Sequence, residues 1–345
     1  MRSASELANR LARDPEAVCR HYLSAGRRAG NYWIVGDTAN SKGKSLYVHL
    51  SGPRAGRWAD GATAEYGDLL DLVRETCGLV DFRDVADEAR RFLNLPQSDP
   101  AASRRGDART YPPVERPADE RAQRLFRITQ PLAGTLADSY LRQRGILRAS
   151  LHPALRYHPS CYYRDLGTGR TNSFPALIAA VTNSDGAITG VHRTWLDPCG
   201  DGKAKIEEPR RALGRLLGNA VRFRFPVNRP VPVMVAGEGL ESVLSLVHVM
   251  PALPMVAALT ANHLAAFRLP NGCERLYIAA DADAAGRHGI ERLSRRAQEQ
   301  GILPLVLSPD LGDFNEDLRQ LGPDRLIANL RAQLAEEDIP LFLPA

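Results

Sequence analysis

Apolar positions in the last third of the chain recur as short runs separated by helical patterns. Four apolar runs lie at residues 231–236, 255–259, 276–280 and 303–307. Amphipathic stretches with the period of a helix lie between them, at 240–249 and 284–300. Apolar strands that alternate with helices are typical of a parallel α/β sheet. In such a sheet, functional groups are expected at the carboxyl ends of the strands.

The first part of the chain mixes shorter strands with helices. Residues 5–25 predict a helical stretch, in which Asp14-Pro15 is typical of a helix start. The pattern after it predicts strands at 32–35, at 45–50 and from residue 57, and helices at 68–73 and 85–95. Residues 96–117 contain almost no aliphatic side chain, which is typical of a linker.

The middle of the chain returns to helix and then to strands. Residues 119–144 predict a helical segment, and the stretch up to residue 225 predicts strands. Apolar runs at 176–181 and 188–195 flank Asp185-Gly186, a dipeptide that favours a hairpin turn. Together the three parts predict an α+β protein whose last part is a parallel α/β sheet.

Composition excludes several classes of protein. The 345 residues are 44% hydrophobic and 25% charged, an ordinary globular composition for about two to three domains. The sequence contains no run of about 18 apolar residues and no secretory signal, so we expect a cytoplasmic protein that does not span a membrane. The five cysteines are scattered without a CxxC pair, which argues against a disulfide framework and a zinc ribbon.

Arginine far outnumbers lysine among the basic residues. Lysine and arginine total 45 against 40 acids, a net charge of +5 that is weak evidence for a polyanionic partner. Only four of the 45 are lysines, and they form two Lys-x-Lys pairs in glycine-flanked loops: Lys42 with Lys44, and Lys203 with Lys205. Chance clustering and contact with phosphate both remain open for these pairs.

Acidic residues follow three of the predicted parallel strands. Glu238 follows the first strand, Asp281 and Asp283 follow the third, and Asp313 lies after the fourth. Residues i and i+2 of an extended chain point the same way, so the two aspartates can share one cation opposite Glu238. Carboxylates that converge repel one another unless a cation compensates, and oxygen ligands favour magnesium. The pattern indicates metal-assisted phosphoryl transfer, although a single acid at such a place is often only a helix cap.

These motifs resemble a known family. The segments Val235-Ala236-Gly237-Glu238-Gly239 and Asp281-Ala282-Asp283-Ala284-Ala285-Gly286-Arg287 are similar to the signature of the Toprim domain of DnaG-type primases, topoisomerases and some nucleases. The resemblance covers about residues 228–322. It implies that Glu238, Asp281 and Asp283 are catalytic and hold Mg²⁺ or Mn²⁺ together with Asp313. The chain departs from the pattern at Asn315, where primases usually carry another aspartate.

The middle region resembles the sheet that precedes the Toprim domain in DnaG-type primases. The similarity rests on segments 174–178, 185–193 and 201–205. It implies that basic residues guide a single-stranded template and nucleotides to the acidic site, where they screen phosphate repulsion. The predicted template or nucleotide contacts are Arg170, Arg193, Lys203, Lys205 and Arg287.

Residues 40–73 resemble in outline the zinc-binding domain of primases, but the cysteines are absent. A tetrahedral zinc site needs four ligands, and His49 and Cys77 stand alone, so no zinc is expected. The candidate DNA contacts of this part are Lys42, Lys44, Arg54 and Arg57, with Trp58 or Tyr47 stacking on bases. A core role for Trp58 is the alternative.

The resemblance implies five parts: a zinc-ribbon-like domain without zinc ligands (1–95), a linker (96–118), a primase-type subdomain (119–227), a Toprim domain (228–325) and a C-terminal helix and tail (326–345). The implied activity is primer synthesis from nucleoside triphosphates on single-stranded DNA, in a protein of a mobile element or phage that works with a separate helicase. The alternatives are a Toprim metal-dependent nuclease and a non-catalytic single-stranded DNA-binding replication factor.

Overall fold

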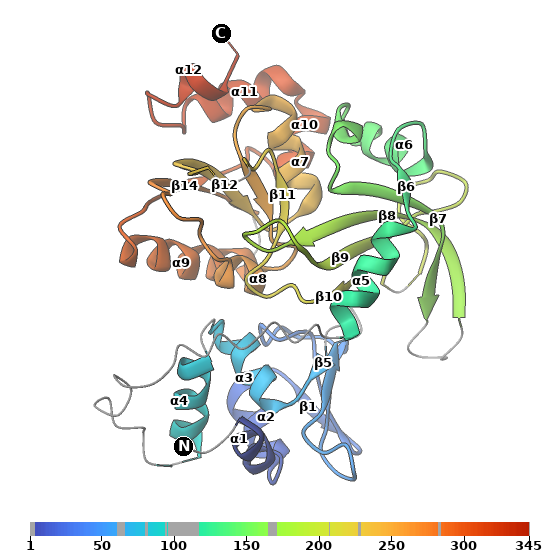
Figure 1. Cartoon of the computed structure of the whole chain (residues 1–345), viewed down its shortest axis with the longest axis vertical. Helices are drawn as coiled ribbons and strands as arrows, with labels where there is room; N and C mark the ends of the chain where they lie inside the picture. The colour runs from blue at the N-terminus through green and yellow to red at the C-terminus, as the bar shows by residue number, and fades with distance from the viewer. Residues whose placement is uncertain are drawn as a thin grey trace. The chain divides into compact units, whose positions relative to one another are not determined.

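The computed structural model describes residues 4–60, 66–79, 82–93, 95, 117–164, 171–206, 208–226, 229–281 and 284–344. Most of the predicted linker, residues 96–116, lies outside these ranges. The chain divides into two compact units, residues 1–120 and 121–345. The described residues form three five-stranded sheets, one in the first unit and two in the second (Figure 1).

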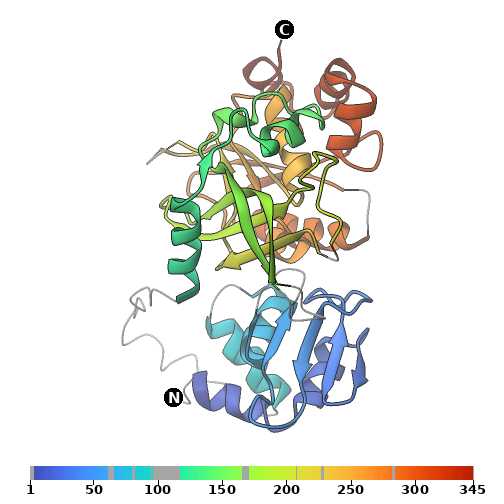
Figure 2. The same cartoon turned by 90° about the vertical axis from the view of Figure 1, so that its right-hand side faces the viewer.

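The first unit packs one face of an antiparallel sheet against helices (Figure 2). The predicted helical stretch 5–25 contains two helices, because Asp14 caps the second by accepting the Ala17 N–H at 3.0 Å. Alternation along β2 and β3 buries Trp33 and Val48 and turns Tyr32 and Tyr47 to the other face. The elements are α1 (Ala4–Leu11), α2 (Pro15–Tyr22), β1 (Arg27–Ala29), β2 (Tyr32–Val35), β3 (Leu46–His49), β4 (Trp58–Asp60), β5 (Tyr66–Gly67), α3 (Leu69–Cys77) and α4 (Phe82–Phe92).

The second unit begins with an antiparallel sheet of strand order β10-β9-β8-β7-β6. The predicted hairpin joins β8 to β9, with Gly186 in the left-handed region at φ +80°. The elements are α5 (Pro117–Arg127), β6 (Gln130–Pro131), α6 (Leu136–Arg142), the 3₁₀ turn η2 (Ala149–Leu151), β7 (Leu155–Arg164), β8 (Thr171–Thr182), β9 (Ile188–Trp195) and β10 (Arg210–Gly214).

The predicted helical segment 119–144 contains two helices, α5 and α6, with the short strand β6 between them. Pro131 lacks the N–H that a continuing helix needs, and Gly134 is left-handed at φ +71°. Thr135 then caps α6 through a long 3.4 Å contact from the Asp138 N–H.

The C-terminal sheet has strand order β11-β13-β12-β14-β15. The last four strands in that order are parallel, and β11 is antiparallel at the edge. The predicted fold class, α+β with a C-terminal parallel sheet, is confirmed. The elements are β11 (Val221–Phe223), β12 (Val233–Gly237), α7 (Leu240–Val249), β13 (Met255–Ala257), α8 (Ala261–Ala266), β14 (Arg275–Ala279), α9 (Ala284–Glu299), β15 (Leu303–Leu307), α10 (Phe314–Gln320), α11 (Pro323–Arg331) and α12 (Ile339–Phe342).

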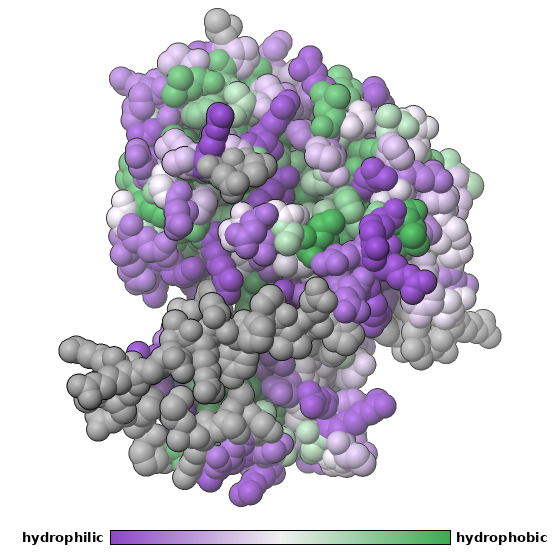
Figure 3. Space-filling model, viewed as in Figure 1, coloured by the Kyte–Doolittle hydropathy of each residue, from purple (hydrophilic) through white to green (hydrophobic). Residues whose placement is uncertain are grey.

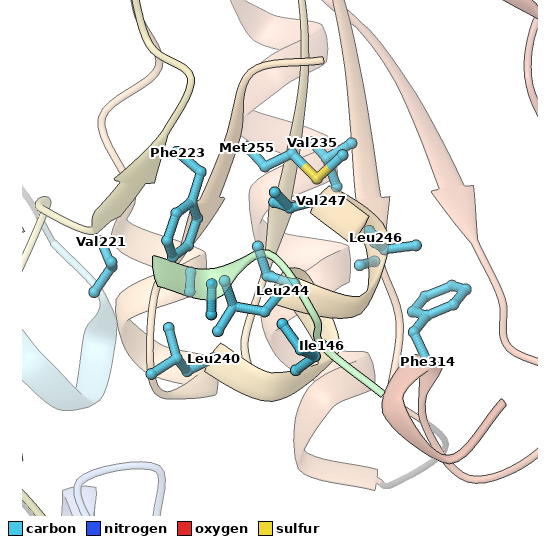
Figure 4. Packing of buried hydrophobic residues seen from close by; sticks show 14 of the residues in the cluster. Ile146, Val221, Phe223, Val235, Leu240, Leu244, Leu246, Val247, Met255 and Phe314 are labelled. Atoms are coloured by element: carbon cyan, nitrogen blue, oxygen red, sulfur yellow. The ribbon is translucent and has the colours of Figure 1, made fainter. Parts of the chain in front are cut away.

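Helices cover both faces of the parallel sheet. Alternate residues of β12 separate the two layers, since Met234 packs with α8 and α9, whereas Val235 packs with α7 and α10 (Figure 4). The α7 layer continues into residues of β8 and α6, so both sheets of the second unit share one hydrophobic core. This shared core fixes the antiparallel sheet against the parallel one, beside the acidic strand ends.

The surface of the second unit seen in Figure 3 is largely hydrophilic, with separate hydrophobic patches. Among the described residues, no helix combines the length and the apolar character needed to cross a bilayer.

Candidate metal and phosphate site

Glu238 and Asp281 follow two neighbouring strands of the parallel sheet. Strands β12 and β14 are neighbours, and Gly237 is paired with Ala279. Glu238 is the first residue after β12, and Asp281 is the second after β14. A Cβ atom built on Gly239 would lie 3.7 Å from Oδ2 of Asp281, so the two loops are in close contact. Both side chains are half-buried.

Close contacts explain why glycine occupies the positions on either side of Glu238. A Cβ atom on Gly237 would lie 2.7 Å from Cγ2 of Val243, too close for any other residue without a shift. A Cβ atom on Gly239 would lie 3.2 Å from Oγ of Ser242 and would narrow the space in front of the Asp281 carboxylate. Helix α7 starts directly after Gly239, so its positive end is near Glu238 and favours negative charge there.

A cavity of about 400 Å³ opens beside Asp281, between α9 and the end of β15. Its lining includes Arg287 and Glu291 from α9, and Ser308 from the loop after β15. Two acidic residues and one arginine thus line the same cavity. Arg287, predicted as a nucleotide contact, is exposed and lies at this cavity with Asp281.

The donor chemistry of this edge fits a divalent cation. Glu238 and Asp281 offer carboxylate oxygens, the ligands that Mg²⁺ and Mn²⁺ favour. The third predicted acid of the motif, Asp283, lies outside the described residues. Within the described part of the chain, no three acidic, histidine or cysteine side chains lie close enough to hold a metal together. The ligand set of Glu238, Asp281 and Asp283 therefore remains a prediction.

Asp313 is the N-cap residue of α10. Its Oδ1 accepts the Glu316 N–H at 2.7 Å, which caps α10. The loop before it is fixed by buried Asp317, which accepts the N–H groups of Asp310 and Leu311 at 2.8 Å each. A metal-binding role for Asp313 stays a prediction beside this capping role.

The hydrogen bonds of Asn315 show why an amide suits this position, at which the primase pattern has an aspartate. The buried amide donates at 2.9 Å to the Arg144 carbonyl and at 2.9 Å to Oγ of Ser245. It thereby ties the segment after α6 to α7 and α10. An aspartate at this position would turn an acceptor toward the Arg144 carbonyl, which is also an acceptor.

We expect Asn315→Asp to lower the free energy of unfolding by about 2–3 kcal/mol, because two buried hydrogen bonds are lost and a charge is left uncompensated. Chemical denaturation of the full chain measures this loss. The matched control is Gln298→Glu, which adds the same charge at an exposed position of α9 and should change stability by less than about 0.5 kcal/mol. Equal stability of the two variants would contradict the structural role of Asn315.

Lys203 lies in a polar cluster next to α7. Its Nζ is 3.1 Å from Oε1 of Glu241, and the hydroxyl of Tyr140 donates to the same oxygen at 2.7 Å. The Arg144 guanidinium lies 4.0 Å from the centre of the Tyr140 ring. Lys203 was predicted from the sequence, whereas Glu241, Tyr140 and Arg144 were not, because they come from segments distant in the sequence.

Arg193 lies on the opposite face of the sheet from this cluster. It is 9% exposed, donates to the Ala212 carbonyl at 2.8 Å, and stacks 4.8 Å above the Trp195 ring. Strand alternation places its neighbour His192 on the other face. Arg210 is paired with Thr194, and so shares the face of His192. The role of Arg193 as a phosphate contact stays a prediction that its burial opposes, and Arg210 is the better-placed arginine that strand alternation could have identified.

The remaining predicted contacts differ in exposure. Lys205 is exposed, and Arg170 lies outside the described residues. In the first unit, the four basic candidates Lys42, Lys44, Arg54 and Arg57 are exposed.

Trp58 is 3% exposed, and its indole N–H donates to the Asp68 carbonyl at 2.9 Å. Stacking of Trp58 on a base stays a prediction that its burial opposes, and the burial favours the alternative of a core role. Tyr32, Tyr47 and His49 lie on the other face of this sheet and are partly exposed, with ring centroids 4.8–5.9 Å apart.

Two segments of the chain match known domain families. Residues 233–324 match the Toprim domain, and residues 116–223 match a domain of unknown function, DUF7146. No curated protein matches the sequence.

Solved structures with similarity include three primases. The Aquifex aeolicus primase (zinc-binding and RNA polymerase domains) has a TM-score of 0.45 at 16% identity, over 97% of this chain and 86% of that chain. The RNA polymerase domain of Mycobacterium tuberculosis primase DnaG has 0.40 at 17%, over 63% and 82%. The bacteriophage T7 primase fragment has 0.35 at 14%, over 59% and 73%. At these values, the similarities by themselves establish no shared activity.

The parallel sheet with its acidic strand ends and the match over 233–324 define a Toprim domain. The Toprim resemblance predicted from the sequence is confirmed. The chain thus contains a Toprim domain over residues 233–324.

Proposed function

We propose that this chain is a primase-like nucleotidyltransferase that joins nucleotides on a single-stranded DNA template. The observation that carries the proposal is the adjacency of Glu238 and Asp281 at the carboxyl ends of neighbouring parallel strands, within the Toprim match. With Asp283 they would hold Mg²⁺ or Mn²⁺. When bound, the ion supplies charge stabilisation to a phosphate and helps to activate a 3′-hydroxyl.

The protein's own residues would bind and orient the reacting phosphates. Arg287 lies at the cavity beside Asp281 and can pair with a phosphate oxygen. Lys203 and Arg210 lie on the side of the antiparallel sheet that shares its core with α7, and Lys205 is exposed in the same loop as Lys203. These cations would offset the repulsion between a polyphosphate and the acidic strand ends.

The first unit would hold template DNA. Tyr32, Tyr47 and His49 lie on one face of its sheet and are partly exposed. The exposed Arg54 and Arg57 lie in the segment between β3 and β4. Aromatic rings next to arginines suit single strands, since every base can stack and every linkage carries a charge.

A nuclease that uses the same acids is the second candidate, because metal-bound carboxylates serve bond formation and hydrolysis alike. A binding factor without activity is the third. The predicted mobile-element or phage origin and the separate helicase rest on the family resemblance.

One assay separates these candidates. The full chain is incubated with a labelled single-stranded DNA, nucleoside triphosphates and Mn²⁺, and the products are resolved by size. New short oligomers support the proposed function, and shortened DNA identifies a nuclease. A mobility shift without either product contradicts catalysis.

A further inference from the structure

A single carboxylate joins three segments at the start of α7. Oε1 of Glu241 accepts the Tyr140 hydroxyl at 2.7 Å and lies 3.1 Å from Nζ of Lys203. Tyr140 belongs to α6, Lys203 to the loop after β9, and Glu241 to the first turn of α7. The side chains of Glu241 and Lys203 are only 13% and 27% exposed. The contact thus links the antiparallel sheet to the Toprim domain.

The electrostatics of the cluster favour the charged pair. Burial by itself would raise the pKa of the Glu241 carboxyl, but Lys203, Arg210 and the Tyr140 hydrogen bond outweigh it and lower the pKa to about 2. Burial lowers the pKa of the Lys203 ammonium, and the Glu241 charge opposes that shift. Glu241 therefore favours the charged form of Lys203 and also fixes its position.

The cations around Glu241 exceed the single negative charge that it provides. Arg210 and Arg144 both act on Lys203, and each disfavours its charged form. His192 faces the same groups, and burial lowers its pKa to about 3, with the charge of Arg210 adding to the shift, so the ring is neutral at pH 7. Among the described groups that act on one another here, the Glu241 carboxylate is outnumbered by three cations, Lys203, Arg210 and Arg144. The excess positive charge would complement a phosphate oxygen.

The place of Glu241 in the chain connects this cluster to the acidic site. Glu241 comes three residues after Glu238, across the Gly239 cap of α7. The loop that carries Lys203 is fixed at its other side by a backbone bridge between Leu196 and Lys203. Lys203 is thereby held from two directions.

We propose that Glu241 is a positioning residue that holds the Lys203 ammonium for contact with a substrate phosphate. Glu241 itself touches no substrate in this account. The inference rests on the proposed function for its substrate class, which is a phosphate of either a nucleoside triphosphate or the template backbone.

The test compares Glu241→Gln with Tyr140→Phe in the full chain. The first variant removes the charge that holds Lys203, whereas the second removes only a hydrogen bond to the same oxygen. Affinity is measured by fluorescence anisotropy with two probes, a methylanthraniloyl ATP and a fluorescein-labelled 12-mer of oligo-dT, from pH 6 to pH 9.5. Circular dichroism checks that both variants are folded.

We expect Glu241→Gln to weaken binding of one probe about tenfold at pH 7.5, which corresponds to about 1.4 kcal/mol. Without Glu241 the pKa of Lys203 falls further, so the loss of binding at alkaline pH should move to lower pH in this variant. Tyr140→Phe should keep wild-type affinity within about twofold and the wild-type pH profile. The probe that is affected identifies the phosphate source.

Equal affinities and pH profiles in the two variants would overturn the positioning role, as would wild-type protein that binds neither probe. The binding readout is independent of primer synthesis. If wild-type protein makes no oligomers but the variants differ as expected, the proposed reaction fails and the positioning role stands. If wild-type protein makes oligomers and the variants bind alike, the reaction stands and the positioning role fails.

Discussion

Replacing Asp281 by asparagine is expected to reduce metal-dependent nucleotide transfer by at least about a thousandfold. A metal ion supplies several kcal/mol of charge stabilisation at a phosphate, and each 1.4 kcal/mol is a factor of ten in rate. The amide keeps the size of the side chain but loses the negative charge that holds the cation. Initial rates of oligomer synthesis at saturating Mn²⁺ measure the effect.

The control for this variant is Asp324→Asn, which removes the same charge from an exposed position in the first turn of α11. It should retain the wild-type rate within about twofold, since an exposed charge far from reacting atoms contributes little. DNA affinity of Asp281→Asn should stay near wild type, because the basic residues are intact. Normal synthesis by Asp281→Asn would contradict the catalytic assignment.

Replacing Asp338 by alanine should lower the free energy of unfolding by about 3–5 kcal/mol, the usual cost of breaking a buried ion pair. Asp338 is 1% exposed and accepts from Arg275 at 2.7 Å and from the Tyr277 hydroxyl at 2.6 Å. The Tyr277 hydroxyl also accepts the Ala335 N–H at 2.9 Å, so the network fixes the C-terminal segment to β14. For a unit of this size, a loss of about 3 kcal/mol lowers Tm by about 6–12 °C.

Glu337→Ala provides the matched comparison, because Glu337 pairs with the same arginine but is 63% exposed. An exposed ion pair contributes less than about 1 kcal/mol, so this variant should melt within about 4 °C of wild type. Thermal denaturation of both variants tests the difference. If Asp338→Ala and Glu337→Ala melt together, the buried network is not what secures the C-terminus.

Local patterns predicted the parallel sheet well, for a physical reason. Strands buried on both faces are continuously apolar, and the helices between them are amphipathic, so both periods are visible in a short window. The predicted helix at 240–249 coincides with α7, and the predicted start of α9 at residue 284 is observed. The short helix α8 was not predicted, because its six residues are too few to display a period.

The candidate site was predictable only where the topology of the sheet brings together residues that each follow a strand. Parallel strands bring their carboxyl ends to one edge, so the sequence placed Glu238 beside Asp281. Lys203 is different, because its partner Glu241 is on another element and no local pattern relates the two.

Trp58 and Arg193 were predicted as nucleic-acid contacts, but the local pattern could not show that they are buried. Both residue types favour nucleic acid when exposed, yet tertiary contacts bury them at 3% and 9% exposure. The period of two along β9 assigns Arg193 to one face, but only the packing of α5 and Trp195 shows that this face is covered.

We expect Glu238 and Asp281 to hold a divalent cation together. A titration of the full chain with Mn²⁺, in which electron paramagnetic resonance counts the free ion, tests it most directly. We expect a Mn²⁺ site in wild type and in Asp324→Asn that is lost in both Glu238→Gln and Asp281→Asn. Undiminished Mn²⁺ binding by the latter two variants would contradict it.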